Sequence, residues 1–123
     1  MPSGSTTFHE AEEHLAPTTR DLHRAIVSLM EELEAVDWYQ QRMDAADDAE
    51  LRDILRHNRD EEKEHAAMVL EWIRRRDAGF DRHLRTHLFT EGSITGREAT
   101  VAAHESSNGT RPRASVGSLR EVR

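Results

Sequence analysis

The segment from about Asp48 to Arg76 contains neither proline nor glycine, and its apolar residues recur at the spacing of an α-helix. They fall on one stripe of that helix: Leu51, Ile54, Leu55, Val69, Trp72 and Ile73. Most of the stability of such a helix comes from packing its apolar stripe against another element. The sequence shows no strand pattern, so the partner is expected to be a second helix.

A second apolar stripe precedes this segment. Its members recur at intervals of four and three residues: Leu22, Ile26, Leu29, Leu33 and Val36. The helix that carries them is expected to begin at Pro17, because proline is favoured in a first turn, and to continue to about Met43. The segment DAADD then turns the chain, and Asp47 with Glu50 fits a capping box for the next helix.

The remainder of the chain carries shorter helical patterns. The pair AlaGly at 78–79 is expected to end the second helix, and a short third helix is expected from about Asp81 to Phe89. The predicted fold is therefore all-α, an antiparallel two-helix hairpin plus a short C-terminal helix. Residues 1–96 are assigned to this helical domain, 97–114 to a flexible linker and 115–123 to a separate tail.

Composition narrows the functional classes. The formal net charge is −7 with 33% charged residues, which argues against a nucleic-acid partner. The absence of cysteine excludes thiolate chemistry. The N-terminal residues lack the basic region and apolar core of a signal peptide, and no apolar run of membrane-spanning length is present. We therefore expect a cytoplasmic protein with no membrane partner.

Two polar residues interrupt the apolar stripe of the second helix. Glu62 and His65, in the stretch DEEKEHAAM, fall in its middle, where an unpaired carboxylate and imidazole are costly. Their i, i+3 spacing puts both on one helix face, so they can bind one metal ion together. An isolated Glu-x-x-His in an acidic helix is more often a pair of solvated side chains. A metal site therefore needs a further ligand.

Glu32 supplies that ligand on the first helix. It precedes Asp47 by 15 residues and Glu62 follows Asp47 by 15, so both lie at the same distance from the turn of an antiparallel hairpin. Mixed carboxylate and imidazole ligation suits iron, manganese or zinc better than calcium. Di-iron carboxylate bundles use a Glu from each of two helices and a Glu-x-x-His from each of two others. This chain has half of that set, so two copies are needed.

Three strings of sequence resemble the encapsulated ferritins: HRAIVSLMEELEAVDWYQQR, HNRDEEKEHAAMVLEWIRRR and FDRHLRTHLFTE. This family is a two-helix branch of the ferritin-like superfamily that is packaged inside encapsulin shells, and the resemblance covers roughly residues 8–95. It implies a homodimer that forms a ferritin-like four-helix bundle, and a ring-shaped homodecamer of five dimers. It also implies a ferroxidase centre for Fe²⁺ and Fe³⁺ made by Glu32, Glu62 and His65 of each subunit, with Tyr39 close by.

The same resemblance implies an outer metal-entry site at Glu31 and Glu34, with Trp38 beside it. Judged by spacing alone, a solvated acidic face explains these carboxylates equally well. Trp38 points away from the core of the predicted hairpin, which favours a second packing surface and assembly beyond one dimer.

The tail beyond the linker contains a short apolar pair around a glycine, in the stretch Ser115, Val116, Gly117, Ser118, Leu119 and Arg120. This stretch resembles the targeting peptide by which cargo docks into an apolar groove on the inner wall of an encapsulin shell. The resemblance implies an encapsulin shell protein as partner, a location inside the nanocompartment, and a tether that raises local concentration.

The function predicted from these features is oxidation of Fe²⁺ to Fe³⁺ by dioxygen at a di-iron site shared between two subunits, for iron storage as encapsulin cargo. Two alternatives stay open. One is a non-enzymatic metal-binding or scaffold cargo protein, which would bind metal without consuming oxygen. The other is a different di-metal oxidoreductase, a peroxidase or a manganese catalase-like enzyme, which metal analysis with peroxide turnover would reveal.

Overall fold

The computed structural model describes residues 4–98 and residue 100. The elements follow in the order η1 (Glu12–His14), α1 (Pro17–Ala45), α2 (Ala49–Arg76) and α3 (Ala78–His87). No strand occurs in this part of the chain, which confirms the all-α class. None of the described helices combines the length and apolar character needed to span a bilayer. The chain divides into two units, Met1–Phe80 and Asp81–Arg123.

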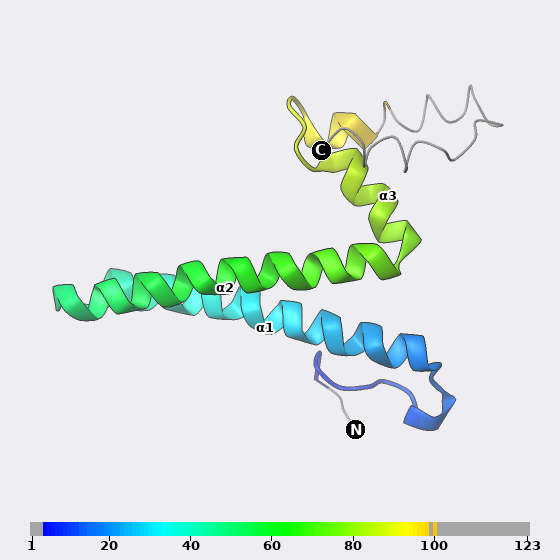
Figure 1. Cartoon of the computed structure of the whole chain (residues 1–123), viewed down its shortest axis with the longest axis horizontal. Coiled ribbons are helices and arrows are strands. Elements are labelled where there is room, and N and C mark those ends of the chain that lie inside the picture. The colour runs from blue at the N-terminus through cyan, green and yellow to red at the C-terminus, as the bar shows by residue number, and fades with distance from the viewer. Residues whose placement is uncertain (1–3, 99, 101–123) are drawn as a thin grey trace. The chain divides into compact units, whose positions relative to one another are not determined.

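In the first unit α1 and α2 pack side by side as an antiparallel hairpin (Figure 1). α1 begins at Pro17, as predicted, since a first-turn proline loses no helical hydrogen bond. The packing of α1 on α2 buries Met43, Ala66 and Ile73, of which Ile73 is only 1% exposed. This small interface joins the two helices that carry the candidate ligands.

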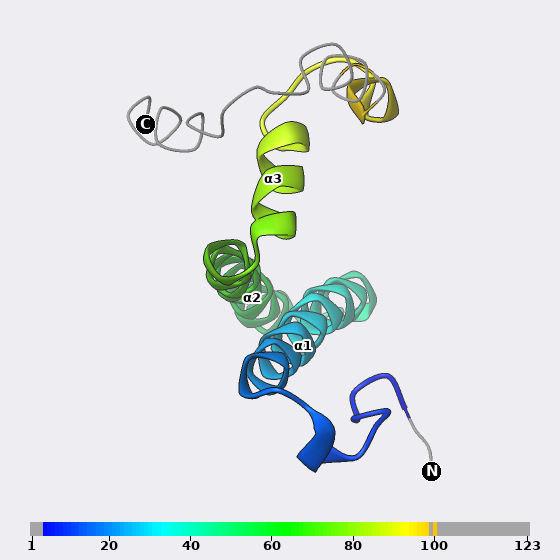
Figure 2. The same cartoon turned by 90° about the vertical axis from the view of Figure 1, so that its right-hand side faces the viewer.

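A leader precedes α1 and contains the short 3₁₀ turn η1. It lies beside the start of α1 (Figure 2). The ring of Phe8 lies 4.5 Å from the ring of His23, measured between centroids, at a tilt of 46°. This contact attaches the leader to the first helix.

The cap of α2 differs from the prediction by one residue. Asp48, and not Asp47, is the N-cap, and its Oδ2 accepts a hydrogen bond from the backbone N–H of Leu51 at 2.7 Å. α1 continues to Ala45, two residues beyond the expected end, so the connection is shorter than the sequence suggested. Either aspartate has the right chemistry for a cap. The position at which the extended backbone turns into the helix decides between them.

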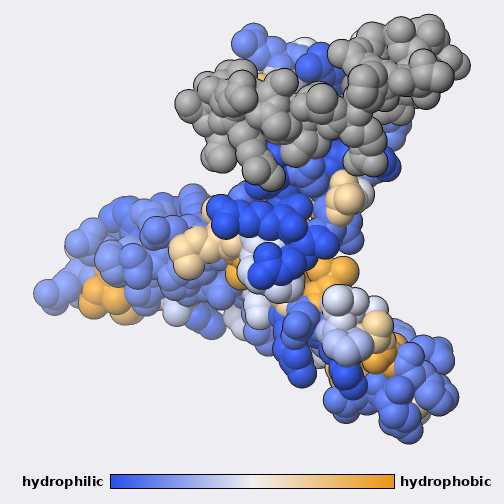
Figure 3. Space-filling model, turned by 45° about the vertical axis from the view of Figure 1, so that its right-hand side comes forward, coloured by the Kyte–Doolittle hydropathy of each residue, from blue (hydrophilic) through white to orange (hydrophobic). Residues whose placement is uncertain are grey.

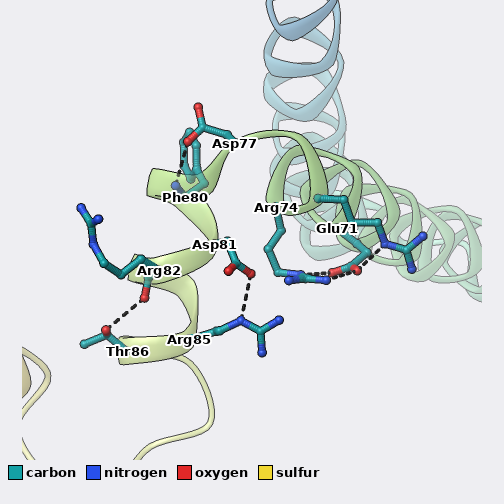
Figure 4. A network of polar contacts seen from close by, with 9 residues as sticks. Glu71, Arg74, Asp77, Phe80, Asp81, Arg82, Arg85 and Thr86 are labelled. Carbon is teal, nitrogen blue, oxygen red and sulfur yellow. Dashed lines mark hydrogen bonds and ion pairs between the residues drawn. The ribbon is translucent and has the colours of Figure 1, made fainter. Parts of the chain in front are cut away.

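α2 ends at Arg76 as predicted, but the start of α3 differs from the prediction. The break occurs at Asp77, and α3 begins at Ala78, so Gly79 lies inside a helix that was expected to begin at Asp81. The side chain of Asp77 explains the shift, because its Oδ1 accepts from the backbone N–H of Phe80 at 2.9 Å and caps the new helix (Figure 4).

Charged side chains lie in the last turns of α2. Arg74 and Arg75 both donate hydrogen bonds to the carboxylate of Glu71, with the shortest N···O distance 2.7 Å in each case. Figure 4 shows the contact of Glu71 with Arg74. These bonds lower the pKa of Glu71 to about 2. The arginines also suit this position because the C-terminal end of a helix attracts positive charge.

Several residues of the two predicted apolar stripes are exposed to solvent. Leu33 on α1 is 55% exposed and Ile54 on α2 is 54% exposed, although both were expected to be buried. Two helices can cover only the facing side of each other, so residues on the flanks of a stripe stay outside. Figure 3 shows one face of the molecule, on which small hydrophobic patches are separated by a largely hydrophilic surface.

The second unit contains most of α3 and the segment after it. Arg85 donates to Asp81 at 2.9 Å, and the hydroxyl of Thr86 donates to the carbonyl of Arg82 at 3.0 Å (Figure 4). α3 ends at His87, two residues before the predicted end, because Phe89 takes a positive φ of 59° that a right-handed helix does not allow. Residues 94–98 form an unpredicted helical turn. The assigned tail, 115–123, and most of the linker lie outside the described residues.

Candidate metal centre

Three side chains from the two long helices converge at one point of the hairpin. Glu32 comes from α1, and Glu62 and His65 come from α2. Nδ1 of His65 lies 3.6 Å from Oε2 of Glu32 and 3.6 Å from Oε1 of Glu62. One ligand atom from each residue lies within 4.8 Å of the other two. The structure thus brings together the three residues that the sequence selected as ligands.

These distances suit a shared ion better than direct hydrogen bonds. A separation of 3.6 Å exceeds the usual N–H···O range. Imidazole and carboxylate ligands lie about 2 Å from a bound transition metal, so ligand atoms on one ion are at most roughly 4 Å apart. Small side-chain rotations would bring all three atoms into that range.

The carboxyl of Glu32 lies in an electrostatically unfavourable position. Its side chain is only 24% exposed, and its Oε2 is buried with no hydrogen-bond partner among the described residues. The close approach of the Glu62 carboxyl, burial and the negative charge of Glu62 all raise the pKa of Glu32, and His65 opposes them. A buried acceptor without a donor, beside a second carboxylate, is what a cation would stabilise.

The local sequence explains why these side chains face each other. Glu32 lies on the face of α1 that contacts α2, and Ala66, next to His65, is a buried small residue that lets the helices approach closely. The ligands also lie at matching distances from the turn between the helices. The site is open on one side, since the imidazole of His65 is 43% exposed. Three ligands leave coordination positions unfilled.

The residues of the predicted outer site lie elsewhere on α1. Glu31 and Glu34 are exposed and Trp38 is 47% exposed, which agrees with a surface facing away from the hairpin core. Within the described residues, Glu32, Glu62 and His65 are the only group of three acidic or histidine side chains placed to hold a metal. Tyr39 is half-buried, and its ring centre lies 5.4 Å from the guanidinium carbon of Arg42.

One polar contact near the site was not foreseen. Arg59, one turn before Glu62 on α2, donates a hydrogen bond of 2.6 Å to the side-chain oxygen of Gln40 on α1. Neither residue stands out in the sequence, because an arginine and a glutamine on polar positions of two helices are ordinary. The contact is evident only in the structure, where the two side chains meet between the helices.

The comparisons with known proteins agree with this architecture. The sequence model of the EncFtn-like family matches residues 7–91. The chain is 62% identical over 109 residues to an encapsulated ferritin-like protein of Rhodospirillum rubrum, covering 89% of this chain and 78% of that protein. It is 34% identical to the encapsulin nanocompartment cargo protein EncC of Myxococcus xanthus, covering 84% of this chain and 88% of that protein.

A solved structure shows the same fold. The crystal structure of a Nitrosomonas europaea protein superposes with a TM-score of 0.69 at 61% identity, and the match covers 71% of this chain and 96% of that one. A ferritin-like protein of Thermotoga maritima is also 50% identical over 103 residues, covering 83% of this chain and 90% of that protein. The family match and the relatives confirm the resemblance seen in the sequence, and the chain belongs to the EncFtn-like family of encapsulated ferritin-like proteins.

Proposed function

We propose that two copies of this protein form a ferroxidase centre that oxidises Fe²⁺ to Fe³⁺ with dioxygen. The observation that carries the proposal is the convergence of Glu32, Glu62 and His65 around the buried Oε2 of Glu32, which has no hydrogen-bond partner in the described part of the chain. The names of the relatives, which include ferritin-like proteins, support iron as the metal.

The need for two copies rests on the number of ligands. Each chain brings two carboxylates and one imidazole, which is half of the set found in di-iron bundles. Two hairpins placed together would make a ferritin-like four-helix bundle with four carboxylates and two imidazoles at its centre. The open side of His65 leaves room for the second copy.

The chain's residues have distinct parts in this reaction, in which iron is the substrate. The carboxylates of Glu32 and Glu62 are hard oxygen ligands that bind Fe²⁺ and favour the ferric product. His65 binds in its neutral form and completes the coordination of each ion. The four carboxylates balance the charge of two ferrous ions, so the empty centre repels itself and the filled centre does not. The two Fe²⁺ ions of one centre lose one electron each, and dioxygen accepts both electrons with two protons from water, which gives hydrogen peroxide.

The outer carboxylates and the tail have supporting roles in the proposal. Glu31 and Glu34, with Trp38 beside them, would attract Fe²⁺ to the surface, and Tyr39 would lie close to the centre. The stretch Ser115 to Arg120 would direct the protein into an encapsulin shell, and a relative named as encapsulin cargo supports this role. A ring of five dimers has no closed cavity, so storage of the ferric product would depend on the shell.

Anaerobic loading with Fe²⁺ followed by admission of oxygen tests the proposed activity. We expect the native protein to consume oxygen and form ferric product faster than iron in buffer, and Glu32→Ala to lose this acceleration. Glu64→Gln, at an exposed position on α2, is the control and should behave like the native protein.

Two results would contradict the ferroxidase. Binding of Fe²⁺ without oxygen uptake would indicate a metal-binding cargo protein. Manganese in the purified protein, together with rapid turnover of peroxide, would indicate a catalase-like enzyme.

A further inference from the structure

The proposed centre depends on the axial register of α1 and α2. Glu32 is on one helix and its co-ligands are on the other, so sliding α1 by a single residue displaces Glu32 by about 1.5 Å. Functional constellations tolerate roughly 0.5 Å. Something in the hairpin must therefore hold the two helices at one register.

Apolar packing is a weak source of that constraint here. The large residues buried between the helices are few, and several members of the predicted stripes are half-exposed. Burial of apolar surface is also non-directional. A directional contact between the helices would discriminate between registers much more sharply.

Arg59 makes such a contact. Its side chain is only 17% exposed. Nη1 donates to Oε1 of Gln40 on α1 at 2.6 Å, while Nε and Nη2 donate to Oδ1 of Asp60 at 3.0 and 2.9 Å. The guanidinium is planar and its donors are fixed relative to one another, so the two acceptors together define its orientation.

Gln40 is also held in place. Its Nε2 donates to Oδ1 of Asp44, one turn further along α1, at 3.0 Å. Both ends of the amide are therefore used, and the oxygen is directed toward α2. These hydrogen bonds form a continuous series of four side chains: Asp44, Gln40, Arg59 and Asp60. The series joins the two helices near Glu62, which follows Arg59 by three residues.

We propose that Arg59 and Gln40 are positioning residues that hold α1 and α2 at the register in which Glu32 faces Glu62 and His65. The inference rests on the proposed metal centre. Neither residue is a ligand; each acts through the placement of Glu32 relative to the other two side chains.

The chain offers a matched control. Arg56 lies on the same helix, and its Nη1 donates to Oδ1 of Asp53 at 3.0 Å, within α2. Its side chain is 51% exposed. Arg56→Met therefore removes an equal charge and a similar hydrogen bond without touching α1. A change seen in Arg59→Met but not in Arg56→Met reports the contact between the helices.

The test combines two readouts that do not use oxidation activity. The first is binding of Co²⁺, followed by visible absorption. We expect Arg59→Met and Gln40→Met each to weaken binding about ten-fold or more, as loss of supporting contacts around metal ligands does. The double variant should be no weaker than Arg59→Met, because both changes remove the same bond. Arg59→Lys keeps one donor for Gln40 and should restore part of the affinity.

The second readout is the NMR signals of the His65 ring in the metal-free protein, which report its position beside Glu32. They should shift in Arg59→Met and stay unchanged in Arg56→Met. Helix content from circular dichroism checks folding, and Gln40→Met carries the test if Arg59→Met does not fold, since Gln40 is exposed.

The outcomes separate this inference from the proposed function. Native-like Co²⁺ affinity and unshifted His65 signals in both Arg59→Met and Gln40→Met overturn the positioning role while the metal centre stands. A native protein that binds no Co²⁺ and oxidises no Fe²⁺ overturns the proposed function. The His65 signals of the metal-free variants then still decide whether Arg59 and Gln40 hold the register.

Discussion

Nδ1 of His65 on α2 lies 3.6 Å from Oε2 of Glu32 on α1, across the contact between the two helices. The carboxylate oxygen is buried and has no hydrogen-bond partner among the described residues. A metal ion bound between these two side chains would satisfy both. Without the ion, the carboxyl of Glu32 faces that of Glu62 and gains a raised pKa.

The raised pKa of Glu32 makes the stability of the metal-free protein depend on pH. The folded state binds the proton of this carboxyl more tightly than the unfolded state. Its contribution therefore favours folding below its ordinary pKa of 4.5 and is lost as pH rises through the raised value. Glu32→Gln should remove this loss and make the metal-free protein more stable than the native one at neutral pH.

Urea denaturation of the metal-free proteins at pH 4.5 and pH 7 measures this effect. The native protein and Glu64→Gln should lose stability between the two pH values by more than Glu32→Gln does. Equal losses in all three proteins would show that the Glu32 carboxyl is not strained in the folded state.

The N-cap of α2 gives a prediction about stability alone. Asp48 accepts a hydrogen bond of 2.7 Å from the backbone N–H of Leu51. Asp48→Ala should lower the free energy of unfolding by about 1 kcal/mol, the usual value for loss of a capping side chain. Asp47→Ala should change it by less than about 0.5 kcal/mol, as exposed substitutions do. Thermal or urea denaturation checks both, and a larger loss in Asp47→Ala would place the cap where the sequence first suggested.

The helices were predictable from the sequence because each carries a long apolar stripe at one period. α1 begins at Pro17 and α2 ends at Arg76, both as predicted. The convergence of Glu32 with Glu62 and His65 was predictable because the same turn connects both helices, and the ligands lie at similar residue distances from it. Equal distance from the turn sets the level of each side chain.

The details that were missed depend on contacts rather than on periodicity. Asp47 and Asp48 are chemically equal candidates for a cap, and backbone geometry chose Asp48. The start of α3 at Ala78 was also missed, because the side chain of Asp77 caps this helix by accepting a hydrogen bond from the backbone N–H of Phe80. The exposure of Leu33 was missed because a stripe on one helix says nothing about how much of it a single partner can cover.

Metal should drive association of the hairpins. Two empty half-sites bring four carboxylates together, and two Fe²⁺ ions neutralise them, so binding favours the assembled state. Analytical ultracentrifugation under anaerobic conditions should show a shift to dimers or larger assemblies when Fe²⁺ is added. His65→Ala should weaken this response because it removes two ligands from each shared centre. A mass distribution that does not change when Fe²⁺ is added would count against a shared site.

Loss of the tail should affect packaging into the shell but not the oxidation of iron. Deleting residues 115–123 should leave oxygen consumption in the presence of Fe²⁺ unchanged, because the deleted residues are far along the chain from the ligands. The same deletion should abolish packaging when the protein is co-expressed with an encapsulin shell. Size-exclusion chromatography followed by gel analysis measures packaging. A truncated protein that still co-elutes with the shell would show that the tail is not the targeting signal.

The central claim is that Glu32, Glu62 and His65 of two chains share one di-iron centre. An anaerobic titration with Fe²⁺, followed by rapid mixing with oxygenated buffer, measures both the number of ions bound and their oxidation. Binding should saturate at about one Fe²⁺ per chain, since each centre of two ions serves two chains. Oxidation should be fast in the native protein and in Glu64→Gln and strongly slowed in Glu62→Gln. Equal oxidation in Glu62→Gln and Glu64→Gln would contradict the site.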